Sequence, residues 1–373
     1  MKVLYLTNIP SPYRVAYFNE LGKYCDLTVI FEKEGYITRD KSWLDYKFEN
    51  FKGFFLPGIE IGLYEKLTFA FVKYLKKEKY DHVIVTNMGT LTGVLAVHWM
   101  KLKNIPYCIE GDGGIAGSRK GIKEKIKTGM ISTAKMCFST SKEHDKYYCQ
   151  YGAMPNNIRR YPFTSLHAKD ILAAPIDNEE KLDIKRKLGI SEKRIILSIG
   201  SFIPRKGMDL LIKATSKIRG DWGIYIIGGE ATEEYLELKK TYQNQNLYFI
   251  DFMKPEKLSD YFKAADLFVL ATREDIWGLV INEAMAYALP VITTNKCVAG
   301  QELVKNGENG YIVESENIEE LREKINILIG SEDMLNACSK KSLETIRDYT
   351  IEKMAETHMK IFSTDDKSDG VMV

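Results

Sequence analysis

The chain has 373 residues, of which 45% are hydrophobic and 28% charged, and its formal net charge is +2. This length exceeds one ordinary domain and fits two, and the hydrophobic content is that of a folded protein, which excludes extensive disorder. No stretch of the sequence approaches the ~18 consecutive apolar residues of a membrane-spanning helix.

The six cysteines and five histidines are dispersed, without the close spacings of metal ligands. We therefore expect reduced thiols, no metal site and a cytoplasmic location. Met1–Ile9 leads directly into a polar turn with two prolines, which favours a first β-strand over a signal peptide.

The small net charge hides an asymmetry between the two halves. Residues 1–165 carry 25 Lys and Arg against 16 Asp and Glu, a balance of +9, and residues 166–373 carry 28 against 35, a balance of −7. This difference indicates that the first half meets something anionic. No nucleic-acid-binding motif accompanies the charge, and nothing specifies an oligomeric state.

Strand-like and helix-like segments alternate through the first half, which predicts a parallel sheet covered on both faces. The irregular, polar segment Pro162–Glu180 interrupts this rhythm and is interpreted as a linker. A second alternating series follows, so we expect an α/β protein of two doubly wound domains, 1–165 and 166–350. Expected first-half strands are Val3–Thr7, Leu27–Phe31, His82–Thr86, Pro106–Glu110 and Met136–Thr140, and expected helices are Tyr13–Lys23, Leu91–Lys103 and Ser141–Gly152.

Two acidic residues, Asp275 and Glu283, are separated by seven positions across a predicted strand–loop–helix unit. The apolar run Ala264–Ala271 predicts the strand, and the periodicity of Leu279–Ala288 predicts the helix. The backbone N–H groups around Ile276–Leu279 should lie at the positive end of this helix, where an anion is favoured. Two acceptor groups beside a phosphate-binding position suit a sugar nucleotide.

A pair of cations follows an earlier predicted strand, Arg194–Gly200, in the segment Gly200–Gly207 (GSFIPRKG). Arg205 and Lys206 suit a pyrophosphate, because arginine binds oxygens in pairs and lysine acts as a point charge. Gly207 permits close backbone approach, and the next strand ends similarly in Gly228 and Gly229.

These segments resemble the retaining glycosyltransferases of the GT-B fold, family 4 in particular. Asp275–Glu283 is similar to their E-x7-E signature, with Asp275 where the family has glutamate. Gly200–Gly207 is similar to their G-R-x-x-x-x-K-G loop, with Ser201 at the arginine position, so that Arg205 would substitute. The segment 290–313 is similar to their P-V-I…G-G…E-L-V…G-x-x-G-Y-L-V tail.

The resemblance implies two Rossmann-like domains with a cleft between them, with the last helix, 351–373, joining the first domain. Glu283 would accept hydrogen bonds from the ribose, and Asp275 from hydroxyls of the transferred sugar. Arg205 and Lys206 would neutralise the leaving diphosphate, without a metal or other cofactor. Retention of configuration without a protein nucleophile is also implied. Further nucleotide-binding residues are expected at Gly200, Gly207, Gly228, Gly229, Ile276, Trp277, Gly278 and Leu279.

Two features of the first half concern the acceptor. Ile9–Arg14 (IPSPYR) resembles a subset of relatives associated with bacterial capsule and exopolysaccharide assembly. Arg14 would bind an acceptor phosphate or be a solvated helix charge. Glu110 and Asp112, in a glycine-rich run after a predicted strand, would orient sugar hydroxyls, with Asp112 as a catalytic candidate; the alternative is a turn made soluble by acids.

The segment Arg119–Lys135 carries six basic residues against one acid, with apolar residues at helical spacing. Such a helix either binds an anionic membrane surface, at the inner face of the membrane, or packs its apolar stripe inward.

The sequence therefore predicts a hexosyltransferase that moves a sugar from a nucleoside-diphosphate sugar to a saccharide or lipid-linked acceptor in cell-surface polysaccharide synthesis. Two alternatives remain open. One is a non-catalytic nucleotide-sugar-binding subunit, because two motif positions depart from the family. The other is a sugar-nucleotide epimerase on the same fold.

Overall fold

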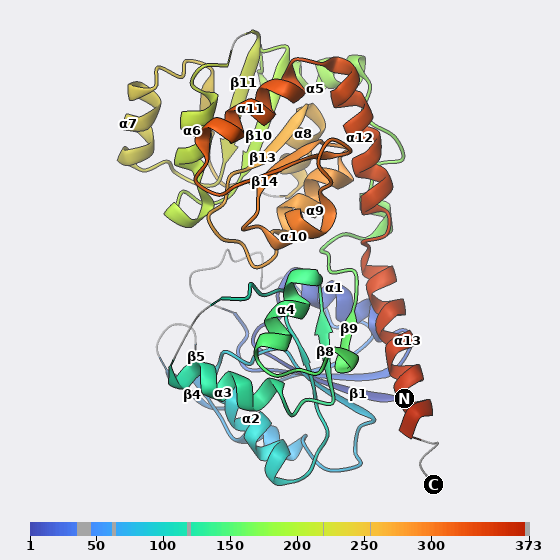
Figure 1. Cartoon of the computed structure of the whole chain (residues 1–373). Helices are drawn as coiled ribbons and strands as arrows, with labels where there is room; N and C mark the ends of the chain where they lie inside the picture. The colour runs from blue at the N-terminus through green and yellow to red at the C-terminus, as the bar shows by residue number, and fades with distance from the viewer. Residues whose placement is uncertain (36–45, 62–64, 118–120, 219, 254, 370–373) are drawn as a thin grey trace. The chain divides into compact units, whose positions relative to one another are not determined.

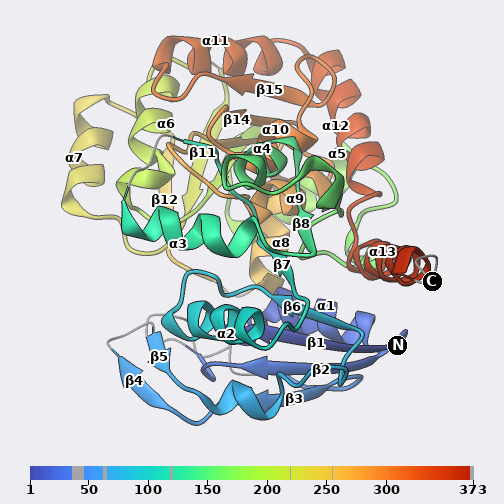
Figure 2. The same cartoon turned by 60° about the horizontal axis from the view of Figure 1, so that its bottom comes forward.

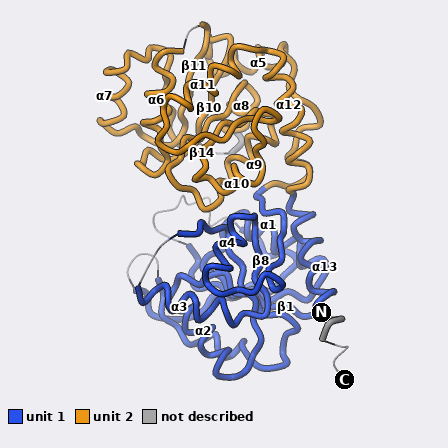
Figure 3. Tube along the Cα trace, in the orientation of Figure 1, with its two compact units in different colours: residues 1–165, 350–373 blue, residues 166–349 orange. Residues whose placement is uncertain are grey.

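The computed structural model describes residues 1–35, 46–61, 65–117, 121–218, 220–253 and 255–369 (Figure 1). The chain divides into two compact units, Met1–Ser165 with Thr350–Val373, and Leu166–Tyr349 (Figure 3). Over the described ranges, no helix combines the length and the apolar character needed to cross a membrane.

The first unit contains a seven-stranded sheet of order β3-β2-β1-β6-β7-β8-β9, in which every neighbouring pair is parallel. The strand order reverses between β1 and β6, which is the switch point where ligands bind in doubly wound sheets. A separate antiparallel hairpin is formed by β4 and β5. The strands are β1 (Lys2–Thr7), β2 (Asp26–Phe31), β3 (Lys52–Phe55), β4 (Ile59–Ile61), β5 (Glu65–Leu67), β6 (His82–Val85), β7 (Cys108–Glu110), β8 (Met136–Ser139) and β9 (Ile158–Arg160).

Helices cover both faces of this sheet. Successive residues of a strand point to opposite faces, and residues on both faces of β1 pack against helices. Leu4 and Leu6 of β1 share a buried cluster with Met100 of α2, a helix that Figure 2 shows beside β1 and β6. Tyr5 points the other way, and its ring centroid lies 5.0 Å from that of Phe18 in α1. The helices are α1 (Pro12–Leu21), α2 (Leu91–Leu102), α3 (Ile122–Ile131), α4 (Lys142–Gln150) and α13 (Ile351–Asp369), with 3-10 turns at Ala70–Lys73 and Pro155–Asn157.

The second unit contains a six-stranded sheet of order β12-β11-β10-β13-β14-β15, again entirely parallel. Its switch point lies between β10 and β13. The strands are β10 (Arg194–Ile199), β11 (Trp222–Ile227), β12 (Leu247–Ile250), β13 (Leu267–Leu270), β14 (Val291–Thr294) and β15 (Gly310–Val313).

Strand β13 shows why this sheet is covered on both faces. Leu267 and Val269 belong to a buried cluster with Leu211 of α6 and Ile325 of α11, whereas Phe268 packs against Phe262 of α8. The helices are α5 (Asn178–Leu188), α6 (Met208–Thr215), α7 (Glu233–Thr241), α8 (Pro255–Ala264), α9 (Leu279–Ala286), α10 (Val298–Leu303), α11 (Ile318–Ile329) and α12 (Glu332–Ile346), with 3-10 turns at Ala168–Asp170 and Pro204–Lys206 (η5).

The expected α/β fold with parallel sheets in two Rossmann-like halves is confirmed. The predicted strand Ala264–Ala271 is observed as the shorter β13, because Ala264 still belongs to α8. The helix expected over Leu279–Ala288 ends at Ala286, and Ala288 takes a positive φ of 59°.

Candidate functional site

The loops after β10 and β13 contact each other at the switch point of the second sheet. The first loop contains η5 and leads into α6, and the second leads into α9. The backbone N–H of Arg273 donates to the carbonyl of Arg205 at 2.8 Å. Arg205 Nη1 in turn donates to the carbonyl of Glu274 at 2.8 Å. Residues about 70 positions apart are thereby joined into one structure.

Lys206 and Asp275 form the central ion pair of this site. Lys206 Nζ donates to Asp275 Oδ2 at 2.6 Å, and Arg205 Nη1 lies 3.9 Å from Asp275 Oδ1. Asp275 is buried, with 7% of its surface exposed, whereas the Arg205 side chain is about half exposed. Three of the residues predicted from the two motifs therefore lie together, with Arg205 on the solvent side.

The start of α9 follows Asp275 directly. Gly278 is the residue before the helix and has φ of 100°. A Cβ at this position would lie 2.8 Å from Cys297 Sγ, so the close approach requires glycine. Burial raises the pKa of the Cys297 thiol to about 12, which keeps it protonated and makes it a packing residue.

The four residues Ile276–Leu279 do not all face the same way. Ile276 is half exposed, whereas Trp277 is buried and its Nε1–H donates to Asn282 Oδ1 at 2.9 Å. The indole is thus part of the core, so Trp277 can offer a ligand only its backbone. Leu279 opens the helix and is partly buried.

Glu283 lies in the second turn of α9 and is partly buried. This turn follows the loop that carries Asp275, as the motif predicts. The assignment of Glu283 to a ribose stays a prediction.

Close contacts between loops explain why two positions of the site require glycine. A Cβ on Gly207, whose φ is 66°, would lie 1.8 Å from the carbonyl oxygen of Ala271, and one on Gly228 would lie 1.9 Å from that of Gly200. Gly229 differs, because its φ is 105° but no atom lies within 4 Å of its virtual Cβ. Gly207 and Gly228 therefore allow the ends of β10, β11 and β13 to pack closely, and their contact with a nucleotide stays a prediction.

Arg273, in the loop after β13, holds the loop after β10 in place through hydrogen bonds. Its Nη1 donates to the carbonyl of Pro204 at 2.6 Å, and its two Nη groups bind the carboxylate of Asp209 at 2.8 and 2.9 Å. It also pairs with Glu316. Neither Asp209 nor Glu316 was predicted from the sequence, because both belong to segments outside the motifs.

In the first unit, Arg14 is buried, and the interpretation as a solvated helix charge is wrong. Its guanidinium pairs with both Glu110, the last residue of β7, and Asp112, two residues further on. The hydroxyl of Tyr13 donates to the second oxygen of Asp112 at 2.6 Å. Both oxygens of Asp112 thus accept hydrogen bonds, so a role in catalysis requires this network to rearrange.

Glu110 is fully buried and lies at the centre of that network. Tyr5 donates to it at 3.0 Å, and His358 Nε2 of α13 lies 3.3 Å from its Oε2. Burial alone would raise the pKa of Glu110, but Arg14 and His358 outweigh it and lower this pKa to about 2. Glu110 is therefore a structural anion that ties α1, β7 and α13 together.

A third acid, Glu32, follows β2 near the switch point of the first sheet and was not predicted from the sequence. Thr90, at the start of α2, donates to it at 2.5 Å, and Asn87 also donates to it. Burial raises the pKa of Glu32 to about 7 despite these donors. No motif identifies Glu32, because it lies among other charged residues directly after a strand.

The basic segment Arg119–Lys135 contains α3, and its residues 119 and 120 lie outside the described residues. Met130 and Ile131 pack into the core, whereas Ile122 and Ile126 are exposed, beside the exposed Lys123 and Lys125. The end of α3 therefore packs inward, whereas its start exposes basic and apolar side chains.

Comparisons with known proteins agree with the fold and the motifs. Residues 180–345 match the family model described as "Glycosyl transferases group 1", a range that includes both loops and α9. An uncharacterized glycosyltransferase of Haemophilus influenzae is 33% identical over 186 residues, which are 48% of this chain and 52% of that protein. The chain spans about half the length of the first curated relatives it matches.

More distant matches extend over more of the chain. The amylovoran biosynthesis glycosyltransferase AmsD of Erwinia amylovora is 23% identical, over 75% of this chain and 77% of that protein. Among solved structures, Anabaena HepE in complex with UDP superposes with a TM-score of 0.79 at 15% identity, over 98% of this chain and 100% of HepE. Sucrose-phosphate synthase of Thermosynechococcus elongatus gives 0.77 at 16% identity, over 99% of this chain and 100% of that one. The whole segment that matches the glycosyl transferases group 1 family model, residues 180–345, therefore lies within the second unit.

Proposed function

We propose that this chain is a retaining hexosyltransferase that transfers a sugar from a nucleoside-diphosphate sugar to a saccharide or lipid-linked acceptor. The observation that carries the proposal is the meeting of Arg205, Lys206 and Asp275 directly before the amino end of α9, at the β10–β13 switch point. Two cations and a helix amino end favour a diphosphate, and the neighbouring carboxylate suits sugar hydroxyls.

The cations assist the reaction because negative charge grows on the diphosphate as it leaves. Groups that bind this charge more strongly in the transition state than in the ground state lower the barrier. In this mechanism Lys206 exchanges Asp275 for the diphosphate, and Asp275 becomes an acceptor for the sugar. Glu283 holds the ribose from the next turn of α9. No metal takes part, since the cations and the helix end supply the positive charge.

The donor and acceptor classes rest on relatives. HepE was solved with UDP and with UDP-glucose, so UDP-sugars are the first donors to test. AmsD takes part in amylovoran biosynthesis, which supports a role in cell-surface polysaccharide synthesis. The +9 balance of the first half and the exposed start of α3 suit an anionic, lipid-linked acceptor at the inner face of the membrane.

A binding subunit without turnover is the second candidate, and one observation favours it. Asp275 is already engaged by Lys206 and is buried, which leaves its carboxylate available to a sugar only after the pair opens. Release of nucleoside diphosphate from a donor distinguishes the two functions.

The experiment is a panel of UDP-, GDP- and ADP-sugars, with affinity measured by calorimetry and turnover by release of nucleoside diphosphate. We expect one base to bind, and Glu283→Gln to weaken that binding about tenfold, as for the loss of a charged hydrogen bond. Glu308→Gln, an exposed site in the same unit, is the control. Wild-type nucleotide affinity in Glu283→Gln would show that the site is misassigned, and absence of binding to the whole panel would exclude the proposed donor class.

A further inference from the structure

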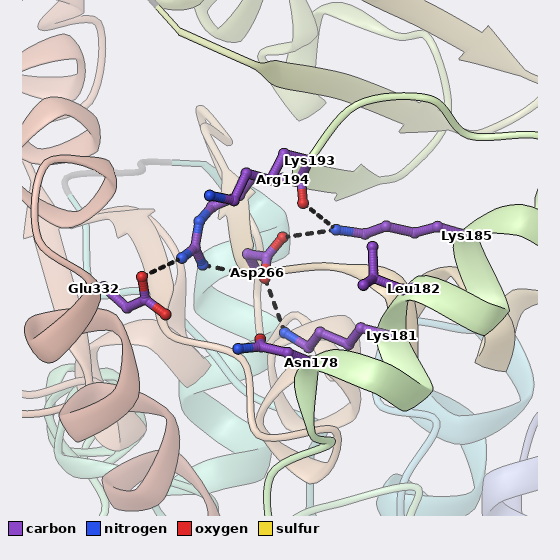
Figure 4. A pocket seen from close by; sticks show the side chains of 8 residues that line it. All are labelled: Asn178, Lys181, Leu182, Lys185, Lys193, Arg194, Asp266 and Glu332. Carbon is purple, nitrogen blue, oxygen red and sulfur yellow. Dashed lines mark hydrogen bonds and ion pairs between the residues drawn. The ribbon is translucent and has the colours of Figure 1, made fainter.

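A pocket lies in the second unit at the amino ends of β10 and β13, whereas the loops of the proposed donor site follow the carboxyl ends of these strands (Figure 4). Arg194 is the first residue of β10, and Asp266 directly precedes β13. Five residue steps along β10, ~17 Å at ~3.3 Å per residue, separate Arg194 from Ile199, where the strand ends before the Gly200–Gly207 loop. The pocket is therefore separate from the proposed donor site.

The walls of this pocket carry more positive than negative charge. Figure 4 shows Lys181, Lys185 and Arg194 directed at the single buried carboxylate of Asp266. Their nitrogen atoms lie 3.0, 3.3 and 3.6 Å from its oxygens. Four cations against two carboxylates leave a surplus of two positive charges among the described lining residues, which are Asn178, Lys181, Leu182, Lys185, Lys193, Arg194, Asp266 and Glu332.

Two helix amino ends also lie at this pocket, and the acidic residues of their first turns offset part of their positive charge. Asn178 is the first residue of α5 and Glu332 the first of α12, and both line the pocket. Each helix carries a partial positive charge at that end. Lys185 is affected by its surroundings, because burial lowers its pKa and Lys181 and Arg194 lower it further, although Asp266 acts in the opposite direction. The positive charge of the pocket is thus only partly compensated.

We propose that this pocket binds a small phosphate-bearing anion. Its volume is about 190 Å³, which is below the ~300 Å³ of pockets for drug-sized ligands but several times the ~30 Å³ of one water molecule in the liquid. This size accepts a phosphoryl group. Lys193 is exposed at the pocket and supplies one donor. Arg194 supplies others, because its guanidinium has five N–H groups.

The charges of the pocket allow a test with effects of opposite sign. Glu332 pairs with Arg194 at 2.9 Å and is more than half exposed, so Glu332→Gln releases the arginine for the anion and should tighten binding. Lys193→Gln should weaken it. Each change is expected to alter the dissociation constant about fivefold, the effect of one exposed charge at close range. Lys187→Gln, an exposed lysine of α5 outside the pocket, should have no effect.

The measurement is calorimetric titration of the full chain with inorganic phosphate at low salt, in a Lys206→Gln background that weakens phosphate binding at the donor loops. A parallel titration with glucose 6-phosphate shows whether the free ion or the ester is preferred. The proposal is supported if either anion binds more tightly to Glu332→Gln, more weakly to Lys193→Gln and with unchanged affinity to Lys187→Gln. Equal affinities in all three variants, or no saturable binding of either anion in the Lys206→Gln background, would overturn the proposal. Opposite effects of two single substitutions cannot arise from general misfolding.

Discussion

Lys206 Nζ lies 2.6 Å from Asp275 Oδ2, so a cation expected to bind the diphosphate and a carboxylate expected to bind the sugar neutralise each other. The pair spans the loops after β10 and β13 and keeps both side chains in place before a donor arrives. Under the proposed function a donor opens it, because the diphosphate competes for the same ammonium group. Donor affinity therefore contains the cost of breaking this pair.

Asp275→Asn should tighten binding of the nucleoside diphosphate while lowering turnover of the nucleotide sugar. The amide competes less well for Lys206, and a gain of about fivefold is expected from a pair worth ~1 kcal/mol. Calorimetry with the nucleoside diphosphate measures the gain. In a Lys206→Gln background the same change should have no effect, because the coupling is lost. Weaker binding in Asp275→Asn alone would mean that Asp275 itself holds the nucleotide.

Arg273→Lys should reduce nucleotide affinity about tenfold, although Arg273 is not expected to touch the ligand. Its guanidinium holds the Pro204 carbonyl and the Asp209 carboxylate at once, and a lysine cannot reproduce this fork. Arg322→Lys is the matched control, because the Arg322 guanidinium likewise binds two groups at once, the carbonyls of Ala214 and Lys213, away from the site. Both variants should lower Tm similarly, and only Arg273→Lys should weaken the nucleotide. An equal effect on affinity would assign Arg273 a general structural role.

Gly207→Ala should be much more damaging than Gly229→Ala. Both positions have positive φ, which costs a non-glycine residue ~1–2 kcal/mol. Only at Gly207 would the added Cβ also collide with backbone, the carbonyl oxygen of Ala271. Melting temperature and nucleotide affinity should both fall further for Gly207→Ala, and equal losses for the two variants would contradict this account.

The fold was predictable because it rests on local patterns. The apolar run of β13 and the periodicity of α9 are readable from short windows, and parallel pairing follows from their alternation. The motif residues fell on the expected loops for the same reason. Side-chain partners were not predictable, because Lys206 and Asp275 are 69 positions apart and Arg14 and Glu110 are 96 apart. Periodicity predicts which faces of helices and strands are apolar. It does not reveal that a carboxylate distant in the sequence pairs with an arginine and so allows the arginine to be buried.

Glu110→Gln should destabilise the protein by ~3 kcal/mol at pH 7, because the buried Arg14 loses one of its two charge partners and keeps only Asp112. The folded-state pKa of Glu110, about 2, lies below the unfolded value of ~4.3. Its stabilising contribution is therefore complete above pH ~4.3 and is lost as the pH falls toward about 2. The difference in free energy of unfolding between wild type and variant should shrink over that window. Glu49→Gln, which is exposed, should show no difference, and a gap that stays constant with pH would contradict the role of the Glu110 charge.

Ile122→Ser should weaken binding to anionic liposomes without lowering Tm, because 76% of the Ile122 surface is exposed. The proposed contact combines this apolar side chain with Lys123 and Lys125, so it should also weaken as salt is raised. Ile59→Ser is the matched control, since Ile59 is 71% exposed in the same unit but lies on β4. Co-sedimentation should fall for Ile122→Ser and stay unchanged for Ile59→Ser. If neutral and anionic liposomes retain the wild type equally, the charge of α3 does not serve a membrane.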